Sequence, residues 1–249
     1  MNNKYNYYGL TDIGKAREIN EDIFDGIIHK DILFLIVADG LGGKEGLPYA
    51  STIALNEMRR YIKKHFVDGT PKELKKLIEN GMYLINRVLL SYRRAEDSLY
   101  GGFGTTFTIC AINKNKDIVI GHAGNTRLYI FRDGKAVPMT KDHTESQRLF
   151  DKGEIKKEEL VNHPENATLT KALGHWEDLD VDILGGKIDQ GDIIILCSDG
   201  VYNMLSDEEI QAILLETGES KKACEWLIEG ANSRGGVDNI VALISYINF

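Results

Sequence analysis

The sequence lacks any long uninterrupted apolar run. None of its apolar stretches approaches the ~18 residues that span a bilayer, and its beginning, MNNKYNYYGL, has no apolar core of the kind found in signal peptides. The rest of the composition is typical of a globular protein, since 43% of the residues are hydrophobic and 27% are charged. We therefore expect a cytoplasmic protein without a membrane partner.

Cysteine is also scarce, and acidic residues outnumber basic ones. The chain has three cysteines, Cys110, Cys197 and Cys224, and two of them lie inside apolar runs. Neither a disulfide framework nor a zinc site is therefore indicated. Thirty Lys and Arg residues face thirty-eight Asp and Glu residues. The resulting net charge of -8 argues against a nucleic-acid partner. It is compatible with carboxylates gathered to bind cations.

Two common catalytic motifs are missing. The G-x-S-x-G elbow of serine hydrolases does not occur, so the histidines have no such nucleophile to activate. They are interpreted as structural or surface residues: His122, His143, His163 and His175. The P-loop frame is absent as well, although Gly42-Gly43-Lys44 faintly resembles its end. These absences direct attention to the carboxylates.

Short apolar runs with β-branched residues predict strands, and turn-forming residues such as Asp133-Gly134 separate them. The runs cover residues 31–38, 105–112, 117–120, 127–131, 181–184, 192–197 and 240–247. Helical patterns come in pairs, at 53–66 and 74–92, and again from Ser206 and over about 221–231. This order is not a strict alternation of strand and helix. We therefore expect an α+β domain in which helices cover antiparallel sheets.

The least regular part of the chain is the segment 143–174. It contains polar helix-like pieces at 145–152 and 156–161, and His163-Pro164 interrupts them. Such surface excursions often carry specificity. We find no linker and no internal repeat, so a single domain over residues 1–249 is expected.

Three aspartates adjoin apolar runs, each with a glycine nearby. Asp39 and Asp199 follow such runs directly, and Asp238 precedes the last one. A simple turn explains any single one of them, but three together favour a site for Mg²⁺ or Mn²⁺, which prefer oxygen ligands. Two such ions about 3.5–4 Å apart activate water for attack on a phosphate. Near the N-terminus, Arg17 and Glu21 belong to a charged run that by itself is typical of a solvated surface; beside two ions, Arg17 would be suited to clamping phosphate oxygens and Glu21 to holding a metal-bound water.

Motifs in a fixed order carry a resemblance to a known family. They are R-E-I-N-E-D at 17–22, V-A-D-G-L-G-G at 37–43, G-G-F-G-T-T at 101–106, G-H-A-G-N-T-R-L-Y at 121–129, T-K-D-H-T at 140–144, L-T-K-A-L-G at 169–174, C-S-D-G at 197–200 and G-V-D-N at 236–239. In order and spacing, from about residue 9 onward, the chain resembles the metal-dependent protein serine/threonine phosphatases of type 2C in their compact bacterial form.

The resemblance implies a four-layer αββα sandwich, in which two antiparallel sheets are flanked by helix pairs. It also implies that two Mn²⁺ or Mg²⁺ ions are bridged by Asp39, with the Gly40 carbonyl on one ion and Asp199 and Asp238 on the other. Glu21 and Asp22 would act through metal-bound waters, and Arg17 would hold the substrate phosphate. The segment 143–174 would include the flap of the family, beside the active site.

The sequence departs from the family at three positions. Animal relatives often have a histidine, a candidate general acid, at the position of Leu41. Bacterial members commonly have an apolar residue there, as this chain does. Asn125 and Asn203 stand where the family usually has aspartates, which together with the equivalent of Asp199 hold a third, weaker ion. An amide is neutral, so two amides in place of two carboxylates remove two negative charges from the site. The site then competes less well with water for Mg²⁺. We expect the third site to be weak or absent.

The expected activity is hydrolysis of phosphoserine and phosphothreonine in proteins by a dimetal-activated water. Two alternatives are a catalytically weak phosphoprotein-binding relative and a small-molecule phosphatase. The resemblance implies phosphoprotein partners, such as a serine/threonine kinase or a regulator of sigma factors. No long apolar surface stripe is evident, so a monomer is expected.

Overall fold

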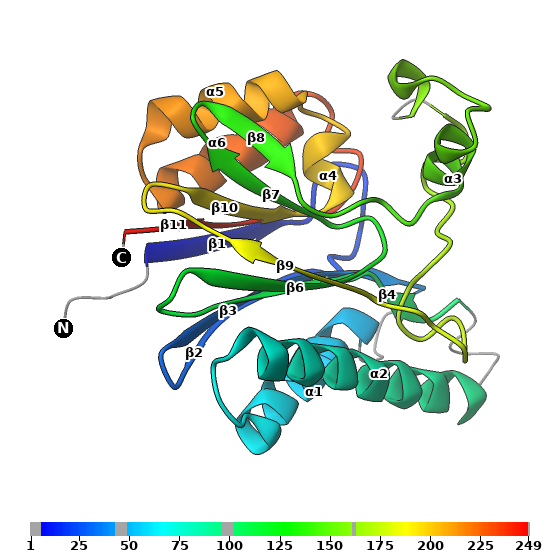
Figure 1. Ribbon diagram of the computed structural model, residues 1–249. Coiled ribbons are helices and arrows are strands. Elements are labelled where there is room, and N and C mark those ends of the chain that lie inside the picture. The colour runs from blue at the N-terminus through cyan, green and yellow to red at the C-terminus, as the bar shows by residue number, and fades with distance from the viewer. Residues whose placement is uncertain (1–5, 43–48, 96–101, 161–162, 249) are drawn as a thin grey trace.

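Two antiparallel β-sheets stack face to face at the centre of the protein (Figure 1). The computed structural model describes residues 6–42, 49–95, 102–160 and 163–248. The first sheet has the strand order β1-β11-β10-β7-β8, and the second has the order β2-β3-β5-β6-β9, with β4 paired to the end of β3. Gly43 and Gly101, which lie in two of the motifs, fall outside the described residues, as does Val161.

The strands of each sheet come from distant parts of the chain. The first sheet contains β1 (Asn6–Asp12), β7 (Arg127–Arg132), β8 (Lys135–Pro138), β10 (Ile193–Cys197) and β11 (Ile240–Tyr246). The second contains β2 (Asp22–His29), β3 (Ile32–Leu41), β4 (Gly104–Thr105), β5 (Phe107–Ile112), β6 (Asp117–Ala123) and β9 (Asp182–Lys187). In Figure 1 the N-terminal β1 lies beside the C-terminal β11, with which it pairs.

A pair of helices covers the outer face of each sheet. The second sheet packs against α1 (Ala50–His65) and α2 (Pro71–Ala95), and the first packs against α5 (Asp207–Thr217) and α6 (Ser220–Ser233). The expected four-layer sandwich is therefore confirmed. Three shorter helices are α3 (Glu145–Asp151), η1 (Lys157–Glu159) and α4 (Asp199–Tyr202). Within the described ranges, no helix is both long and apolar enough to cross a membrane.

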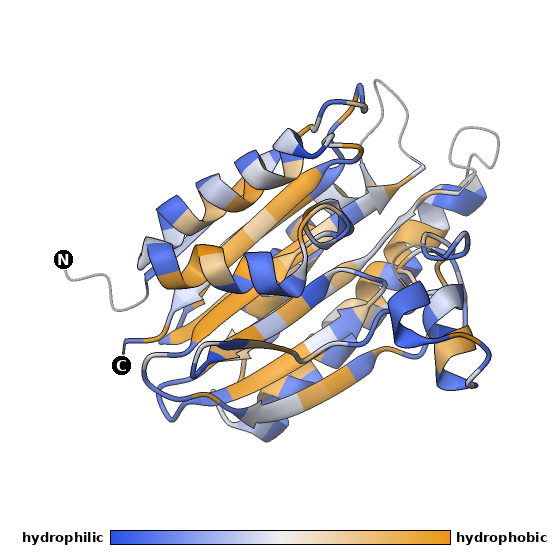
Figure 2. Cartoon of the chain, turned by 90° about the horizontal axis from the view of Figure 1, so that it is seen from above, coloured by the Kyte–Doolittle hydropathy of each residue, from blue (hydrophilic) through white to orange (hydrophobic). Residues whose placement is uncertain are grey.

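Apolar side chains fill the three spaces between the four layers. Phe34 and Ile36 of β3 face α1 and α2, whereas Leu33, Leu35 and Val37 face the other sheet. This strand is buried on both faces, which explains its continuous apolar sequence. Figure 2 shows apolar residues concentrated along the strands. The run ends at Asp39, where the strand reaches the end of the sandwich.

The expectation that the first strand begins at Asp31 is wrong, since β1 and β2 precede it. A glycine inside each of these two strands weakens its sequence pattern. A Cβ added to Gly26 would lie 2.1 Å from the ring of Tyr7, and one added to Gly9 would lie 2.3 Å from the ring of Phe24. The aromatic rings cross the space between the sheets and occupy the place of the missing side chains. The short helix α4 was not expected either, because one turn has no readable period.

Several local predictions are confirmed. Ser206 accepts a hydrogen bond from the backbone of Glu209 and forms the N-terminal capping box of α5. Asp133 and Gly134 both adopt positive φ at the turn between β7 and β8, as a two-residue hairpin requires. The irregular segment forms α3 and η1, and it leaves the sandwich at one end (Figure 1).

Candidate active site

The carboxylates predicted from the sequence gather at one end of the two sheets. The register between β2 and β3 places Asp22 directly opposite Asp39. Asp199 follows β10 as the first residue of α4, and Asp238 lies two residues before β11, which pairs with β10. Hydrogen bonds between Ser198 and Val241 hold these last two segments together at 3.1 Å. Strand pairing thus brings together residues that are about 200 positions apart in the chain.

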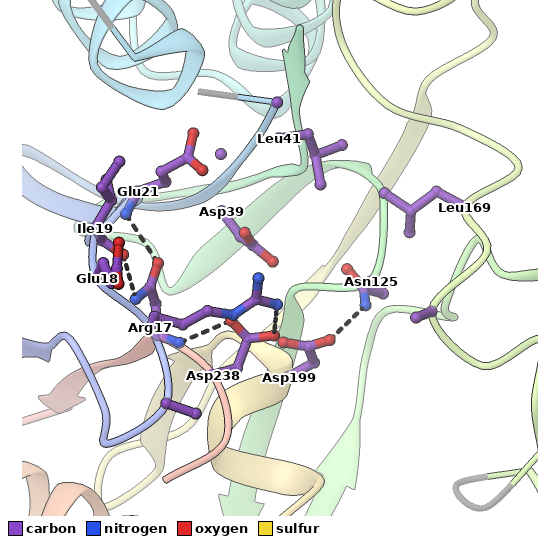
Figure 3. A pocket seen from close by; sticks show the side chains of 15 residues that line it. Arg17, Glu18, Ile19, Glu21, Asp39, Leu41, Asn125, Leu169, Asp199 and Asp238 are labelled. Carbon is purple, nitrogen blue, oxygen red and sulfur yellow. Dashed lines mark hydrogen bonds and ion pairs between the residues drawn. The ribbon is translucent and has the colours of Figure 1, made fainter. Parts of the chain in front are cut away.

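These side chains surround a cavity of about 430 Å³. Asp39, Asp199 and Asp238 point toward the same space, with Arg17 beside them (Figure 3). Arg17 donates a hydrogen bond of 2.8 Å to Asp238, and 55% of its side chain is exposed. Asp22 lies opposite Asp39 on the neighbouring strand and is buried. The cavity therefore presents a cluster of carboxylates together with one guanidinium.

Burial makes the charged form of these carboxylates unfavourable. Desolvation, together with the neighbouring charges of Asp22, Asp199 and Asp238, raises the pKa of Asp39 well above its usual range. Desolvation also raises the pKa of Asp22 to about 7, with further contributions from Asp199 and Asp238. The pKa of Asp199 rises to about 6, because it is buried and lies near Asp238. Additional positive charge at this place would stabilise all of these carboxylates.

The donor set fits divalent cations that prefer oxygen. The buried Oδ2 of Asp22 has no hydrogen-bond partner among the described residues, and a buried acceptor of this kind is uncommon. Among the described residues, there is no group of three His, Cys, Asp or Glu side chains that is already arranged to hold a metal ion. Asp238 is held by Arg17 and Asp199 by Asn125. A cation bound here would share these two carboxylates with their present partners, since an ionised carboxylate has several acceptor positions.

Gly40 lies where β3 passes the loop that carries Glu21. Its N–H donates to the Glu21 carbonyl at 3.2 Å, and the Ser51 hydroxyl donates to the same carbonyl at 2.6 Å. A Cβ on Gly40 would come within 2.8 Å of the Cβ of Glu21. Only glycine allows this close approach, and its consequence is that Glu21 lines the cavity together with Gly40.

Comparison with known proteins agrees with this arrangement. Residues 15–231 match the model of the family described as Protein phosphatase 2C. The chain belongs to this family. It is 32% identical over 237 residues to serine/threonine phosphatase stp of Listeria monocytogenes serotype 4b (strain F2365), covering 94% of this chain and 92% of that protein. It is 30% identical over 238 residues to protein phosphatase PhpP of Streptococcus pneumoniae serotype 2 (strain D39 / NCTC 7466), covering 95% of each.

Solved structures of similar proteins have the same fold. The serine/threonine phosphatase of S. agalactiae superimposes with a TM-score of 0.87 at 28% identity, over 98% of this chain and 100% of that one. The catalytic domain of PstP in complex with two manganese ions superimposes with a TM-score of 0.82 at 28% identity, over 98% and 99% of the two chains. The present protein is a metal-dependent serine/threonine protein phosphatase of the compact bacterial form, and phosphoproteins are its substrate class.

The structure brings both asparagines of the expected third site close to Asp199 in the phosphatase. Asn125 lines the cavity and donates a hydrogen bond of 3.2 Å to the Asp199 carboxylate. Asn203 ends α4, and its N–H donates to the Asp199 carbonyl at 2.9 Å. The amide of Asn125 thus presents a donor to the carboxylate that a third ion would share. The Oδ1 of the same amide is buried and has no hydrogen-bond partner among the described residues.

Two further residues of the phosphatase organise the site without having been selected from the sequence. Asn239 accepts from the N–H of Glu21 at 2.9 Å and donates to the carbonyls of Ile13 and Ile19. It fixes the loop that carries Arg17 and Glu21. Its place in the G-V-D-N motif was the available signal. Asn166 of the irregular segment contacts Asn203, and nothing in its local sequence indicated this.

Three of the four histidines singled out from the sequence make long-range contacts within the fold of the phosphatase. His122 is fully buried, contacts Thr108 and the Lys141 carbonyl, and stacks on His143 with 4.7 Å between ring centroids. Burial lowers the pKa of His122 to about 3, so its ring is neutral near pH 7. His175 contacts the Gly102 carbonyl. Among the described residues that line the cavity there is no histidine.

Proposed function

We propose that this phosphatase removes phosphate from phosphoserine and phosphothreonine with two divalent ions, Mn²⁺ or Mg²⁺, held between its clustered aspartates. The observation that carries the proposal is the convergence of buried carboxylates with raised pKa values beside a single arginine. Asp39 would contact both ions, the Gly40 carbonyl one of them, and Asp199 and Asp238 the other. Two bound ions would supply charge neutralisation and activation of the attacking water.

Glu21 and Asp22 have more distant roles in the proposal, because each would act through an intervening water. Glu21 lines the cavity, so its carboxylate is within reach of solvent there. Asp22 is buried opposite Asp39 on the neighbouring strand, which keeps it close to the ligand that the two ions would share. Both residues orient water rather than contact the phosphate.

Arg17 binds the phosphate in this proposal. The guanidinium carries five N–H donors in a planar fork, which suits two oxygens of one phosphate. Hydrogen bonds from Lys15 and Ala16 to the Gly236 carbonyl, at 2.7 and 3.3 Å, fix the backbone beside Arg17. The bond to Asp238 then orients the side chain at the rim of the cavity. The loop geometry thus holds the arginine in place before the substrate arrives.

The apolar part of the cavity supports a protein substrate. Ile19, Leu41 and Leu169 line the cavity beside the carboxylates (Figure 3). A phosphorylated residue within a peptide brings neighbouring backbone and side chains that bury such surface. Among phosphoproteins, we propose a serine/threonine kinase or a regulator of sigma factors as the physiological substrate. Three buried free thiols support the further proposal of a cytoplasmic location.

Hydrolysis of p-nitrophenyl phosphate by chelator-treated protein, with and without added Mn²⁺, tests the proposal. We expect turnover only with the ion. Asp39→Asn removes the shared ligand, so kcat/KM falls by about a thousandfold, which corresponds to several kcal/mol of lost transition-state stabilisation. Asp133→Asn, on the exposed hairpin between β7 and β8, is the matched control with unchanged turnover. Metal-independent turnover, or full activity of Asp39→Asn, contradicts the proposal. A phosphothreonine peptide should also compete better than sugar phosphates.

A further inference from the structure

The irregular segment returns to the sandwich through residues 163–170, which we call the flap foot. Its backbone is tied to the start of the segment: the N–H of Glu145 donates to the Thr168 carbonyl at 2.8 Å, and the N–H of Thr170 donates to the His143 carbonyl at 2.8 Å. Ala167 and Leu169 of the flap foot line the catalytic cavity. The position of the flap foot therefore decides the shape of one wall of that cavity.

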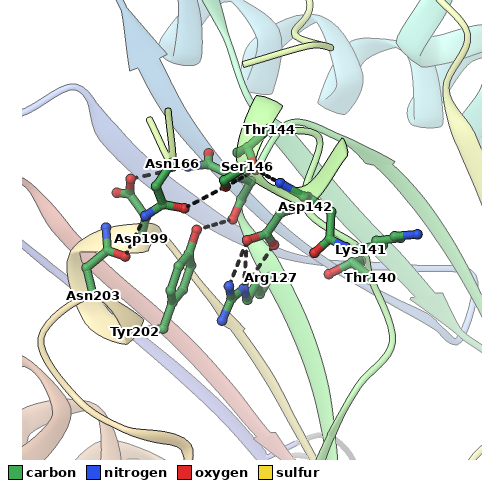
Figure 4. Close-up of polar contacts among 12 residues, drawn as sticks. Arg127, Thr140, Lys141, Asp142, Thr144, Ser146, Asn166, Asp199, Tyr202 and Asn203 are labelled. Carbon is green, nitrogen blue, oxygen red and sulfur yellow. Dashed lines mark hydrogen bonds and ion pairs between the residues drawn. The ribbon is translucent and has the colours of Figure 1, made fainter. Parts of the chain in front are cut away.

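One side-chain contact joins the flap foot to α4. The Nδ2 of Asn166 donates to the Oδ1 of Asn203 at 3.4 Å, and the Ser146 hydroxyl lies 3.5 Å from the Oδ1 of Asn166 (Figure 4). Asn203 lies one turn after Asp199 on the same short helix. The contact thus connects the wall of the cavity with the helix that carries one of its aspartates.

The α4 side of this contact is held rigidly. The Tyr202 hydroxyl donates to the Asn125 carbonyl at 2.8 Å. The guanidinium of Arg127 lies 3.5 Å from the centre of the Tyr202 ring and forms a two-pronged ion pair with Asp142. Because charge-assisted pairs and buried hydrogen bonds restrain side chains strongly, α4 provides a fixed platform.

We infer that Asn166 and Asn203 form an amide contact that positions the flap foot against the catalytic cavity. Both groups are neutral, so the contact needs no cation, although the family resemblance implies an aspartate and a third ion at position 203. Asn166 and Asn203 are positioning residues, since they act through Ala167 and Leu169. The role of the cavity in this inference rests on the proposed function, whereas the contact between Asn166 and Asn203 is observed independently of it.

Hydrogen exchange and peptide kinetics together test the inference. We expect Asn203→Leu and Asn166→Leu to speed exchange of the bonded amides of Asn166, Thr168 and Thr170 by roughly three- to tenfold, the range of one modest hydrogen bond. The exchange measurement uses metal-free protein, so it is independent of turnover. The ratio of kcat/KM for a phosphothreonine peptide to that for p-nitrophenyl phosphate should fall by a similar factor, because only the peptide reaches the flap foot.

Two further variants sharpen the test. The double variant should show no larger effect than either single one, since both remove the same contact. Asn203→Asp keeps an acceptor oxygen and should retain slow exchange. The control is Asn80→Leu, at an exposed position of α2, which should leave exchange and the kinetic ratio unchanged.

Unchanged exchange at residues 166–170 in both single variants would overturn the inference, as would additive effects in the double variant. Loss of slow exchange in Asn203→Asp would overturn it too. Failure of the proposed function is distinguishable, because it would appear as metal-independent hydrolysis of p-nitrophenyl phosphate by the unmodified chain.

Discussion

At the scale of single residues, the charged forms of the active-site carboxylates are energetically unfavourable in the metal-free protein. Asp39 faces Asp22 across a strand pair and is surrounded by two further aspartates, so burial and repulsion both raise its pKa. Asn125 has a different effect, since its neutral amide donates to Asp199 and partly offsets the rise in the pKa of that carboxyl that burial and Asp238 cause. With amides at positions 125 and 203, we expect the cluster to bind fewer cations than it would with aspartates there.

This reasoning predicts the number of bound ions. The unmodified protein should bind two Mn²⁺ ions with high affinity, and the double change Asn125→Asp and Asn203→Asp should add a third, because it restores two negative charges beside Asp199. Isothermal titration of metal-free protein measures the stoichiometry, and anomalous scattering from Mn²⁺-soaked crystals locates the ions. The change Asn80→Asp on the surface of α2 tests the effect of one added negative charge away from the cavity. Strong anomalous density between Asn125, Asn203 and Asp199 in the unmodified protein would refute this prediction.

At the scale of the elements, the sequence pattern was readable wherever burial was simple. Strand β3 is apolar on both faces and was found, whereas β1 and β2 were missed because glycine and polar residues interrupt their alternation. Asp39, Asp199 and Asp238 were found because each adjoins an apolar strand. The contact of Asn166 with Asn203 was not predictable, since it depends on how an irregular segment returns across 37 positions.

The packing of β1 on β2 makes a prediction about stability. Gly26→Val should destabilise the protein by about 1–3 kcal/mol, because the new side chain overlaps the Tyr7 ring and overpacks the core. Thermal unfolding measures the effect. Tyr7→Ala in the Gly26→Val background should recover part of the loss by creating space, although it removes the bond from the Tyr7 hydroxyl to the Gly26 carbonyl.

A matched control for this prediction is Gly153→Asn. Gly153 has a φ of +74°, which asparagine tolerates, and a Cβ added there meets nothing within 4 Å. Its melting temperature should stay close to that of the unmodified protein. Equal destabilisation by Gly26→Val and Gly153→Asn would show that the reciprocal packing of glycine and aromatic ring is not the cause.

At the scale of the whole molecule, folding and ion binding are linked through protons. Folding raises the pKa of Asp22 from 3.8 to about 7 and that of Asp199 to about 6, so the metal-free folded state holds protons that the unfolded state has lost. The stability that these groups contribute is fully present below about pH 4, the unfolded pKa, and decreases as the pH rises through about 7. A cation has to displace the same protons, so its affinity increases over this range.

We therefore predict that the stabilisation by Mn²⁺ is larger at pH 8 than at pH 5. Each tenfold gain in affinity adds about 1.4 kcal/mol when the ion is in excess, or roughly 3–6 °C in melting temperature for a chain of this size. Taking the difference between Mn²⁺-loaded and chelator-treated protein at each pH cancels the titration of groups outside the site, such as His122. In Asp39→Asn the difference should shrink at both pH values, whereas in Asp133→Asn it should persist. An equal shift at pH 5 and pH 8 would mean that the aspartate cluster does not bind the ion in competition with protons.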